Sequence, residues 1–565
     1  TRGSNLSATR VNASQLIEKG RENLLLQSNQ FDTTWGLSAA ITITSGQSGY
    51  DGTNDAWLLK RSDANSRFIF QDITSSGVNT FSFFAKPESV NFVFVYCFNA
   101  GGNDAGVYLD LANGTVGNTS GAGLIDSKIT LSTNGFYRCS LTINNLTQAR
   151  MYPAVANGSV TGGVSNAGIY IQDAQLEKGL VATPYIETGA TTAQAGILEN
   201  TPRFDYSGGA TCPSLLLEPS RTNAMVQSEY ISSLPKGSVI TLDNQTTSPQ
   251  GLVNAGKLIE TATTARHELY SQQINFSSNS NISFFVKAAG RRYISAFIGG
   301  NPAYGGATFD VQDGVVSATS GGASSSIVDY GNGWYRCSLS STNTLGISQV
   351  YYCMRTIGSS VTVETYTGDG TSGFYLWGLQ TELSASYPTS YIPTYGVSQT
   401  RAVDVCNKTG ATSLIGQTEG TMYVEFEFNS NNTDGYPRIL SLGDGGANNR
   451  ILIMAQNTEV FRFYVQRGGV IQVDIITSTS LFGGKHKVAF GYKENDFVAY
   501  VDGVQVGADT SGTVPNTTNV YLGSHESINQ AVEGLVQEAM LFKTRLSNLD
   551  LAILTGATTY NTFAA

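Results

Sequence analysis

A repeat with an offset of about 200 residues is the feature that most restricts how this chain of 565 residues can fold. Five segments recur in the same order further along the chain, and the clearest pair is NGFYRCSL at 134–141 and NGWYRCSL at 332–339. Self-similarity in this form arises when a whole structural unit is duplicated. The sequence therefore predicts two modules of one fold, module 1 at residues 21–190 and module 2 at residues 221–397.

Strand patterns fill both modules. Apolar residues alternate with others over short runs, as at 92–96, 107–111 and 293–297, and Asn-Gly or Asp-Gly pairs separate the runs, as at 134–135 and 332–333. Charged residues make up only 13% of the chain, against about 25% in an average soluble domain. Because strong helix formers are scarce, we predict an all-β chain in which each module is a jelly-roll-like β-sandwich.

Three segments outside the modules are predicted connectors, at residues 1–20, 191–220 and 398–419. The second contains Pro and Gly, which break regular structure, and the run 215–217 (LLL), which needs an apolar surface to cover it. We expect an ordered connector here and not a flexible tether. Connectors of one type before each module suggest beads mounted along a common stalk.

The pattern changes near residue 420. A clean alternating strand at 421–428 is followed by strands at 438–444, 486–492, 497–506, 520–524 and 535–542. A short helix is expected at 547–554, capped by Ser547 and stopped by Gly556. These features predict a second kind of β-sandwich at residues 420–558, with a tail at 559–565.

Charge and composition exclude several classes of partner. The net charge is −10, and no run of Lys or Arg exceeds two residues, so the chain lacks the basic surface that nucleic acid requires. No apolar stretch approaches the ~18 residues of a membrane helix, so we expect no membrane insertion. The N-terminus lacks the order of a signal peptide, and Thr1 suggests a processed or truncated start. Six cysteines without C-x-x-C spacing predict small buried thiols.

Two resemblances refine the fold class. The C-terminal sandwich resembles concanavalin A-like and laminin G-like domains in its hairpin at 500–503, its strand at 522–524 and its strand at 534–542. The two modules resemble the jelly rolls of carbohydrate-binding modules, with Asn-Leu-Leu at 23–25, Trp35, and a late acidic strand at 172–177.

A third resemblance concerns biology. Residues 202–206 (PRFDY), 215–223 (LLLEPSRTN) and 332–337 (NGWYRC) together resemble bacteriophage and prophage fibre or appendage proteins. This resemblance implies a virion surface protein, a head or tail fibre, assembled in the host cytoplasm and exposed outside the cell. Such a fibre is expected to be a homo-oligomer, commonly a trimer. It would contact other virion proteins through its N-terminal region and attach to bacterial surface polysaccharide.

Catalysis has little support in the sequence. The three histidines show no metal-ligand or nucleophile spacing, and neither G-x-S-x-G nor H-E-x-x-H occurs. A carboxylate pair for glycoside hydrolysis cannot be nominated. We therefore expect a fibre or adhesin that binds host glycans and is not an enzyme. A purely structural virion protein and, with less support, a polysaccharide-degrading enzyme remain alternatives.

Glycan binding needs aromatic faces for the C–H faces of a sugar and rigid polar side chains for its hydroxyls. In the C-terminal sandwich two loops carry such residues: Tyr436, Asp444, Asn448, Asn449 and Arg450 on one, and His525, Glu526 and Asn529 on the other. We also nominate Trp57, which sits beside polar residues, as an exposed contact. Trp35, Trp334 and Trp377 lie in strand patterns and are expected in the cores.

No cofactor is certain, but the resemblance to carbohydrate-binding jelly rolls implies a structural calcium ion. Such an ion bridges the first and last strands through oxygen ligands. Asp32 and Asp173 occupy the corresponding positions in module 1. Module 2 has Glu229 and Gly378 instead, which weakens the expectation there.

Overall fold

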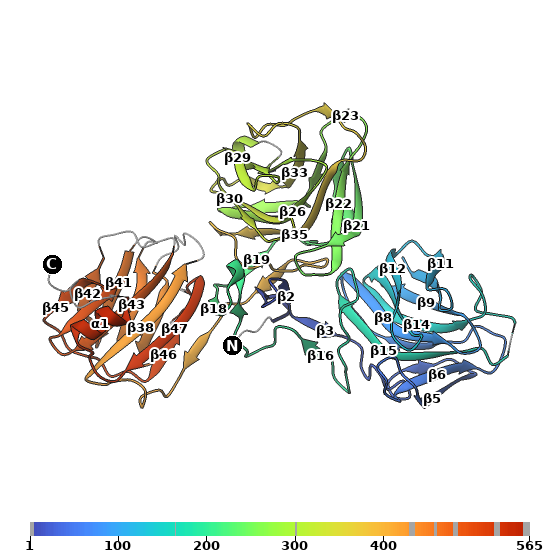
Figure 1. Ribbon diagram of the computed structural model, residues 1–565, viewed down its shortest axis with the longest axis horizontal. Coiled ribbons are helices and arrows are strands. Elements are labelled where there is room, and N and C mark those ends of the chain that lie inside the picture. The colour runs from blue at the N-terminus through green and yellow to red at the C-terminus, as the bar shows by residue number, and fades with distance from the viewer. Residues whose placement is uncertain are drawn as a thin grey trace.

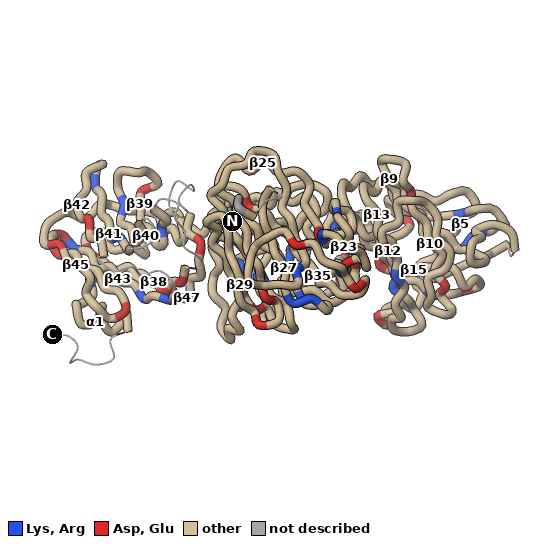
Figure 2. Tube along the Cα trace, turned by 90° about the horizontal axis from the view of Figure 1, so that it is seen from above, with Lys and Arg blue, Asp and Glu red and all other residues tan. Residues whose placement is uncertain are grey.

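The computed structural model describes residues 5–163, 165–299, 302–428, 436–456, 460–477, 484–524 and 531–556. Figure 1 shows three β-rich lobes around a junction that the connectors form. In the view of Figure 2 the charged residues are scattered over the lobes in small groups of both signs. Among the described residues, no helix has the length and apolar character needed to cross a membrane.

Module 1 is a sandwich of two six-stranded antiparallel sheets, in the orders β11-β10-β9-β14-β7-β4 and β12-β13-β8-β15-β6-β5. Its buried side chains form one core between the sheets. The strands are β4 (Gly36–Leu37), β5 (Ile41–Gln47), β6 (Ala56–Arg61), β7 (Ile69–Asp72), β8 (Val78–Pro87), β9 (Phe92–Asn99), β10 (Ala105–Asp110), β11 (Thr115–Ser120), β12 (Leu124–Leu131), β13 (Tyr137–Asn144), β14 (Leu146–Ala154) and β15 (Gly168–Lys178).

Module 2 repeats this order strand for strand, as β29-β28-β27-β33-β24-β20 and β30-β31-β26-β35-β22-β21. The strands are β20 (Lys236–Gly237), β21 (Val239–Thr247), β22 (Val253–Glu260), β24 (Glu268–Tyr270), β26 (Ser280–Ala289), β27 (Tyr293–Ile298), β28 (Gly306–Asp310), β29 (Val315–Ser320), β30 (Ser324–Asp329), β31 (Trp334–Ser341), β33 (Val350–Arg355) and β35 (Gly373–Leu383). Small additional pairs join β23 (Thr264–Ala265) to β34 (Tyr366–Thr367) and β25 (Ile274–Phe276) to β32 (Gly346–Ser348). The predicted jelly-roll-like fold is confirmed in both modules.

The C-terminal domain is a differently wired sandwich, with sheets β17-β18-β47-β38-β43-β44-β45 and β37-β46-β39-β40-β41-β42. Ser547 caps helix α1 (Asn548–Leu554) as predicted, by accepting a hydrogen bond from the amide of Asp550. The strands are β17 (Phe204–Asp205), β18 (Ser214–Leu217), β37 (Cys406–Lys408), β38 (Glu419–Phe428), β39 (Arg438–Gly443), β40 (Arg450–Gln456), β41 (Val460–Arg467), β42 (Val470–Ile476), β43 (Lys485–Lys493), β44 (Phe497–Val501), β45 (Val504–Asp509), β46 (Asn519–Leu522) and β47 (Gly534–Phe542).

The connector at 191–220 completes the C-terminal domain, because its strand β18 pairs with β47. Leu217 enters the apolar core of that domain, so the predicted need of the Leu run for a covering surface is met. The remaining elements of the connectors and module edges are η1 (Asn5–Ser7), β1 (Thr9–Val11), β2 (Ile17–Lys19), β3 (Arg21–Asn23), β16 (Ala193–Ala195), η2 (Ser207–Gly209), β19 (Arg221–Asn223) and β36 (Gln399–Arg401). Strand β19 pairs with β35 of module 2 and with β36. Two short 3₁₀ turns, η3 (Ile231–Ser233) and η4 (Pro302–Tyr304), belong to module 2.

The expected beads along a common stalk are instead three lobes around one junction, in which the connectors pack against one another (Figure 1). Arg203 and Arg401 are fully buried, and both contact the buried carboxylate of Glu218, at 2.7 and 3.0 Å. Arg203 also pairs with Asp404. The N-terminal hairpin β1-β2 places Ile17 in an apolar cluster of module 2 that contains Trp377, Trp334 and Phe285. Three connectors far apart in sequence therefore form one junction.

The buried residues largely agree with the sequence predictions. Trp35, Trp334 and Trp377 are all buried, as expected. Four cysteines are buried free thiols, whereas Cys212 is exposed and Cys406 is half-buried. Those two lie in connectors, where less apolar structure covers them.

Candidate functional site

One sheet face of module 1 is covered by aromatic rings. In β9, the side chains of Val93, Val95 and Cys97 enter the core. The alternate residues face outward, because successive side chains of a strand point to opposite faces. The strand register identifies the residues of β7, β10 and β14 that lie beside them on the same face. We call the resulting set the aromatic face, and it consists of Phe68, Phe70, Phe92, Phe94, Tyr96, Phe98, Tyr108 and Tyr152.

The rings contact one another across the strands. Phe94 stacks on Tyr108 with 4.3 Å between ring centroids and lies 5.4 Å from Tyr152. The guanidinium of Arg150 lies over Phe68 at 4.2 Å and over Phe98 at 4.4 Å, within the range of cation–π attraction. This packing holds the rings in fixed positions while most of them stay partly exposed.

Polar groups border the aromatic face. The hydroxyl of Tyr96 donates to Asp104 Oδ2 at 3.0 Å, and Arg150 donates to the hydroxyl of Tyr152 at 3.2 Å. Burial raises the pKa of Tyr96, and the hydrogen bond to Asp104 raises it further, so the phenol stays protonated at neutral pH. The face therefore offers apolar rings together with neutral hydroxyl groups and a fixed cation.

Module 2 carries a different set of side chains on the equivalent face. Tyr270, Tyr351 and Phe297 stack there, at the positions of Phe70, Arg150 and Tyr96. The strand register equates Phe94 with Ser295, Tyr108 with Thr308 and Tyr152 with Cys353. Thr308 Oγ1 instead donates to the carbonyl oxygen of Ser360, in a loop that folds over the module. The duplicated modules thus share a framework and differ at this face. Sequence reasoning missed the aromatic face, although β9 carries an aromatic residue at every second position.

The C-terminal candidates separate into two groups. Tyr436 packs against Tyr464, and the guanidinium of Arg462 lies over both rings, at 5.5 and 5.1 Å. Arg450 lies 5.7 Å from the ring of Tyr464. The structure therefore brings Tyr436 and Arg450 to one face of the domain, connected through Tyr464.

The other described candidates stabilise a loop. Asp444 accepts a hydrogen bond from the side-chain amide of Asn449, at 2.8 Å. The side-chain oxygen of Asn449 accepts from the amide of Gly468, and the carbonyl oxygen of Asn448 accepts from the amide of Gly469. These bonds join the 444–449 loop to the β41-β42 turn. His525, Glu526 and Asn529 lie outside the described residues.

The expectation that Trp57 is exposed is wrong. Its side chain belongs to the core of module 1, its residue exposure is 8%, and its ring packs edge-on against Phe31 at 6.1 Å. The indole N–H donates to the carbonyl oxygen of Asn29. The polar neighbours that suggested exposure belong to the preceding loop, whereas Trp57 itself lies in β6.

The two predicted calcium ligands have different surroundings. Asp32 is exposed, whereas Asp173 is buried and accepts a hydrogen bond from the hydroxyl of Tyr50 at 2.9 Å. Burial, with smaller effects of Asp55 and Asp51, raises the pKa of Asp173 to about 7. Within the described ranges, no three His, Cys, Asp or Glu side chains form a group that could hold a metal ion. A calcium ion bound by Asp32 and Asp173 stays a prediction.

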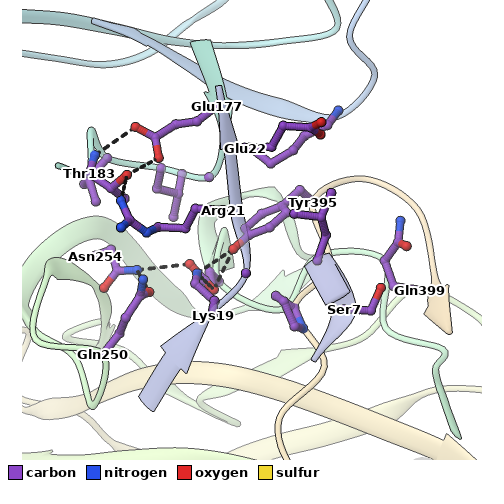
Figure 3. A pocket seen from close by; sticks show the side chains of 18 of the residues that line it. Ser7, Lys19, Arg21, Glu22, Glu177, Thr183, Gln250, Asn254, Tyr395 and Gln399 are labelled. Atoms are coloured by element: carbon purple, nitrogen blue, oxygen red, sulfur yellow. Dashed lines mark hydrogen bonds and ion pairs between the residues drawn. The ribbon is translucent and has the colours of Figure 1, made fainter. Parts of the chain in front are cut away.

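A pocket of about 180 Å³ lies at the junction (Figure 3). Lys19 forms an ion pair with Glu229 at 2.8 Å and donates to the hydroxyl of Tyr395 at 2.5 Å. Asn254 donates to the same carboxylate at 3.0 Å, and Arg21 donates to Thr183 Oγ1 at 2.8 Å. Since these polar groups already bind one another, we interpret the pocket as a joint that fixes the modules.

Comparisons with known proteins concern parts of the chain. Residues 408–552 match the model of the concanavalin A-like lectin/glucanases superfamily, also described as a laminin G domain. No curated protein matches the chain.

Among solved structures, the Ruminococcus gnavus IT-sialidase CBM40 bound to alpha2,3 sialyllactose is similar at 16% identity. That match covers 26% of this chain and 86% of that one, with a TM-score of 0.23. The CBM22-1-CBM22-2 tandem domain from Paenibacillus barcinonensis Xyn10C shares 9% identity over 68% of this chain and 100% of that one, with a TM-score of 0.20. Mouse laminin alpha1 domains LG4-5 share 13% identity over 60% and 91%, with a TM-score of 0.19.

Proposed function

We propose that the chain is a non-catalytic adhesin that binds glycans of the bacterial cell surface through the aromatic face of module 1. The observation that carries the proposal is this cluster of partly exposed rings on a rigid sheet. Aromatic rings pack against the apolar C–H faces of sugars, and the bordering Tyr96, Asp104 and Arg150 can bind hydroxyl groups. Module 2 has a smaller aromatic stack on the equivalent face, of Tyr270, Tyr351 and Phe297, so the two modules can be compared directly by experiment.

The sequence resemblance to phage fibres supplies the biological setting of the proposal. The chain is then a head or tail fibre on a virion surface, a homotrimer that other virion proteins hold through the N-terminal region. Single sugar contacts are weak, and three copies around one axis add avidity without a deep pocket. The C-terminal domain adds a second contact region at Tyr436 and Arg450.

A purely structural fibre is the second candidate function. The observation that favours it is the buried junction of Arg203, Arg401 and Glu218, which fixes three lobes in one arrangement. Such a junction suits a spacer that holds other parts of a particle apart. Binding experiments separate the two functions, because a spacer has no glycan ligand.

The test is a glycan array with the intact chain, followed by titration of the best polysaccharide. The informative variant is Phe70→Ala on the aromatic face. Tyr270→Ala is its matched control, because the strand register places Phe70 opposite Arg150 in module 1 and Tyr270 opposite Tyr351 at the same position in module 2.

Loss of one stacking ring is expected to weaken binding about tenfold, or about 1.4 kcal/mol. The control variant should bind like the unaltered chain. An array without any bound polysaccharide, or equal losses in both variants, would reject the proposal.

A further inference from the structure

A polar groove of about 600 Å³ lies along the seam between module 1 and module 2. Module 1 contributes Asn103, Gly123 and Asn145, and module 2 contributes Gln227, Tyr230 and the adjoining Gly396. The groove is not lined by the C-terminal candidate residues, by the charged side chains of the junction pocket or by the rings of the aromatic face. It adjoins the junction pocket, with which it shares Ser76 and Val397, and its other lining residues belong to none of the sites described above.

The seam that forms the groove is held by direct contacts between the modules. The amide of Val78 donates to the carbonyl oxygen of Tyr395 at 2.9 Å. The backbones approach closely here, because a Cβ added at Gly77 would lie 1.5 Å from that carbonyl oxygen. Asn244 of module 2 also donates to Asp126 of module 1, at 2.6 Å. Contacts at several points fix the width of the groove.

The groove is electrically neutral. Among the described residues that line it, none carries a charged side chain. Its walls are amides, glycine backbone, one phenol, one serine and the aliphatic side chains of Ala122, Leu124, Ile125 and Val397. Burial, and then the carboxylate of Asp243, raise the pKa of Tyr230, so its hydroxyl stays protonated. A charged ligand would lose its hydration here without gaining an ion pair.

Among the side-chain amides that line the groove, the oxygens of two already accept hydrogen bonds, whereas the oxygen of a third does not. Asn145 Oδ1 accepts from the amide of Gly77 at 2.7 Å, and Asn99 Oδ1 accepts from the amide of Gly101. In contrast, the side-chain oxygen of Gln227 is buried and has no hydrogen-bond partner in the part of the chain that the structure describes. An unsatisfied buried acceptor costs about 1–3 kcal/mol, which a ligand hydroxyl would relieve as the amide turns toward it.

The groove begins at the end of β9, the strand that carries Phe94 and Tyr96. Asp104 follows groove residue Asn103 and accepts hydrogen bonds both from the hydroxyl of Tyr96 and from the amide of Asn99. Strand β9 leads from Phe94, at the centre of the aromatic face, to Asn99 at the groove. The five steps from Phe94 to Asn99 span about 16 Å at a rise of about 3.3 Å per residue. A ligand that reaches both regions must be an extended chain.

We infer that the seam groove binds one part of a neutral polysaccharide chain while another part of the same chain lies on the aromatic face. This inference rests on the function proposed above. The ligand class is a long, uncharged, hydroxyl-rich chain. Module 2 then takes part in recognition through Gln227 and Tyr230.

The experiment uses the full chain and measures affinity for short and long uncharged oligosaccharides cut from the polysaccharide with the strongest array signal. Tyr230→Phe removes only a hydroxyl group, and Asn103→Ala changes an exposed side chain, so both variants are expected to fold. Each should weaken binding of the long oligosaccharide by about tenfold and leave binding of the short one unchanged. Phe70→Ala should weaken binding of both.

The outcomes are separable. If the unaltered chain binds short and long oligosaccharides equally, or if Tyr230→Phe and Asn103→Ala bind the long one normally, the groove has no role and the inference fails while the proposed function stands. If only acidic polysaccharides bind, the neutral ligand class is wrong. If Phe70→Ala also binds normally, the proposed function itself fails.

Discussion

Replacement of the buried carboxylate at the junction, Glu218→Gln, should loosen the packing of the connectors. Glu218 contacts Arg203 at 2.7 Å and Arg401 at 3.0 Å, and it accepts from Ser390 Oγ at 2.6 Å. The substitution keeps the shape of the side chain and removes its charge. Two buried guanidinium groups are then left with Asp404 as the remaining carboxylate of this cluster.

The magnitude follows from the pKa of Glu218. Burial alone would raise this pKa, but Arg401 and Arg203 lower it from 4.5 to about 2. At about 1.36 kcal/mol per unit, the charged form contributes about 3 kcal/mol to stability. Because the pKa is lowered in the folded state, this contribution is complete above pH 4.5 and is lost as the pH falls toward 2. Breaking a buried ion pair costs a similar amount, about 3–5 kcal/mol.

Hydrogen exchange measured by mass spectrometry tests this value at residues 203–218. If the junction loses about 3 kcal/mol of stability, its backbone amides should exchange about a hundredfold faster at neutral pH. Glu18→Gln is the matched control, because Glu18 pairs with Arg10 at the equivalent place of the first connector and is about a quarter exposed. An exposed pair contributes at most about 1 kcal/mol, so its exchange should rise less than about fivefold. Equal effects of the two variants would refute the reasoning.

Three further predictions concern stability and assembly. Because the pKa of Asp173 is raised to about 7, the free energy of unfolding of module 1 should fall by about 4 kcal/mol as the pH rises from 3.8 to 7. Asp173→Asn should therefore raise the unfolding temperature of module 1 at pH 8 but not at pH 4. Lys19→Met leaves Glu229 buried without its cation and should destabilise module 2 by about 3 kcal/mol, read by tryptophan fluorescence in urea. The trimer proposal predicts a mass of about 180 kDa by light scattering, three times the chain mass of 60.1 kDa, and a 60.1 kDa particle would remove the avidity argument.

Much of the fold follows from local pattern. The repeat predicts two modules of the same strand order, since equivalent residues meet equivalent partners. Asn134 and Gly135 both have positive φ, as the predicted hairpin turn requires, and Asn332 and Gly333 repeat this. Short periodicity and turn residues are sufficient for these features, because they depend on neighbours in the chain.

The arrangement of the connectors could not be predicted in this way. Leu216 pairs with Leu535, and no local pattern records which distant strand a short apolar run will join. The same limit applies to the aromatic face, which requires the register of β9, β10 and β14 as well as the alternation within β9. Trp57 shows the converse error, because polar neighbours in a loop do not determine where a strand residue points.

The central claim is that the aromatic face of module 1 touches the glycan, and hydroxyl-radical footprinting tests it most directly. With the bound polysaccharide present, oxidation of Tyr96 and Tyr108 should fall severalfold, while oxidation of Tyr270 and Tyr293 in module 2 should stay the same. Unchanged oxidation of Tyr96 and Tyr108 under saturating polysaccharide, or protection confined to Tyr436, would contradict the claim.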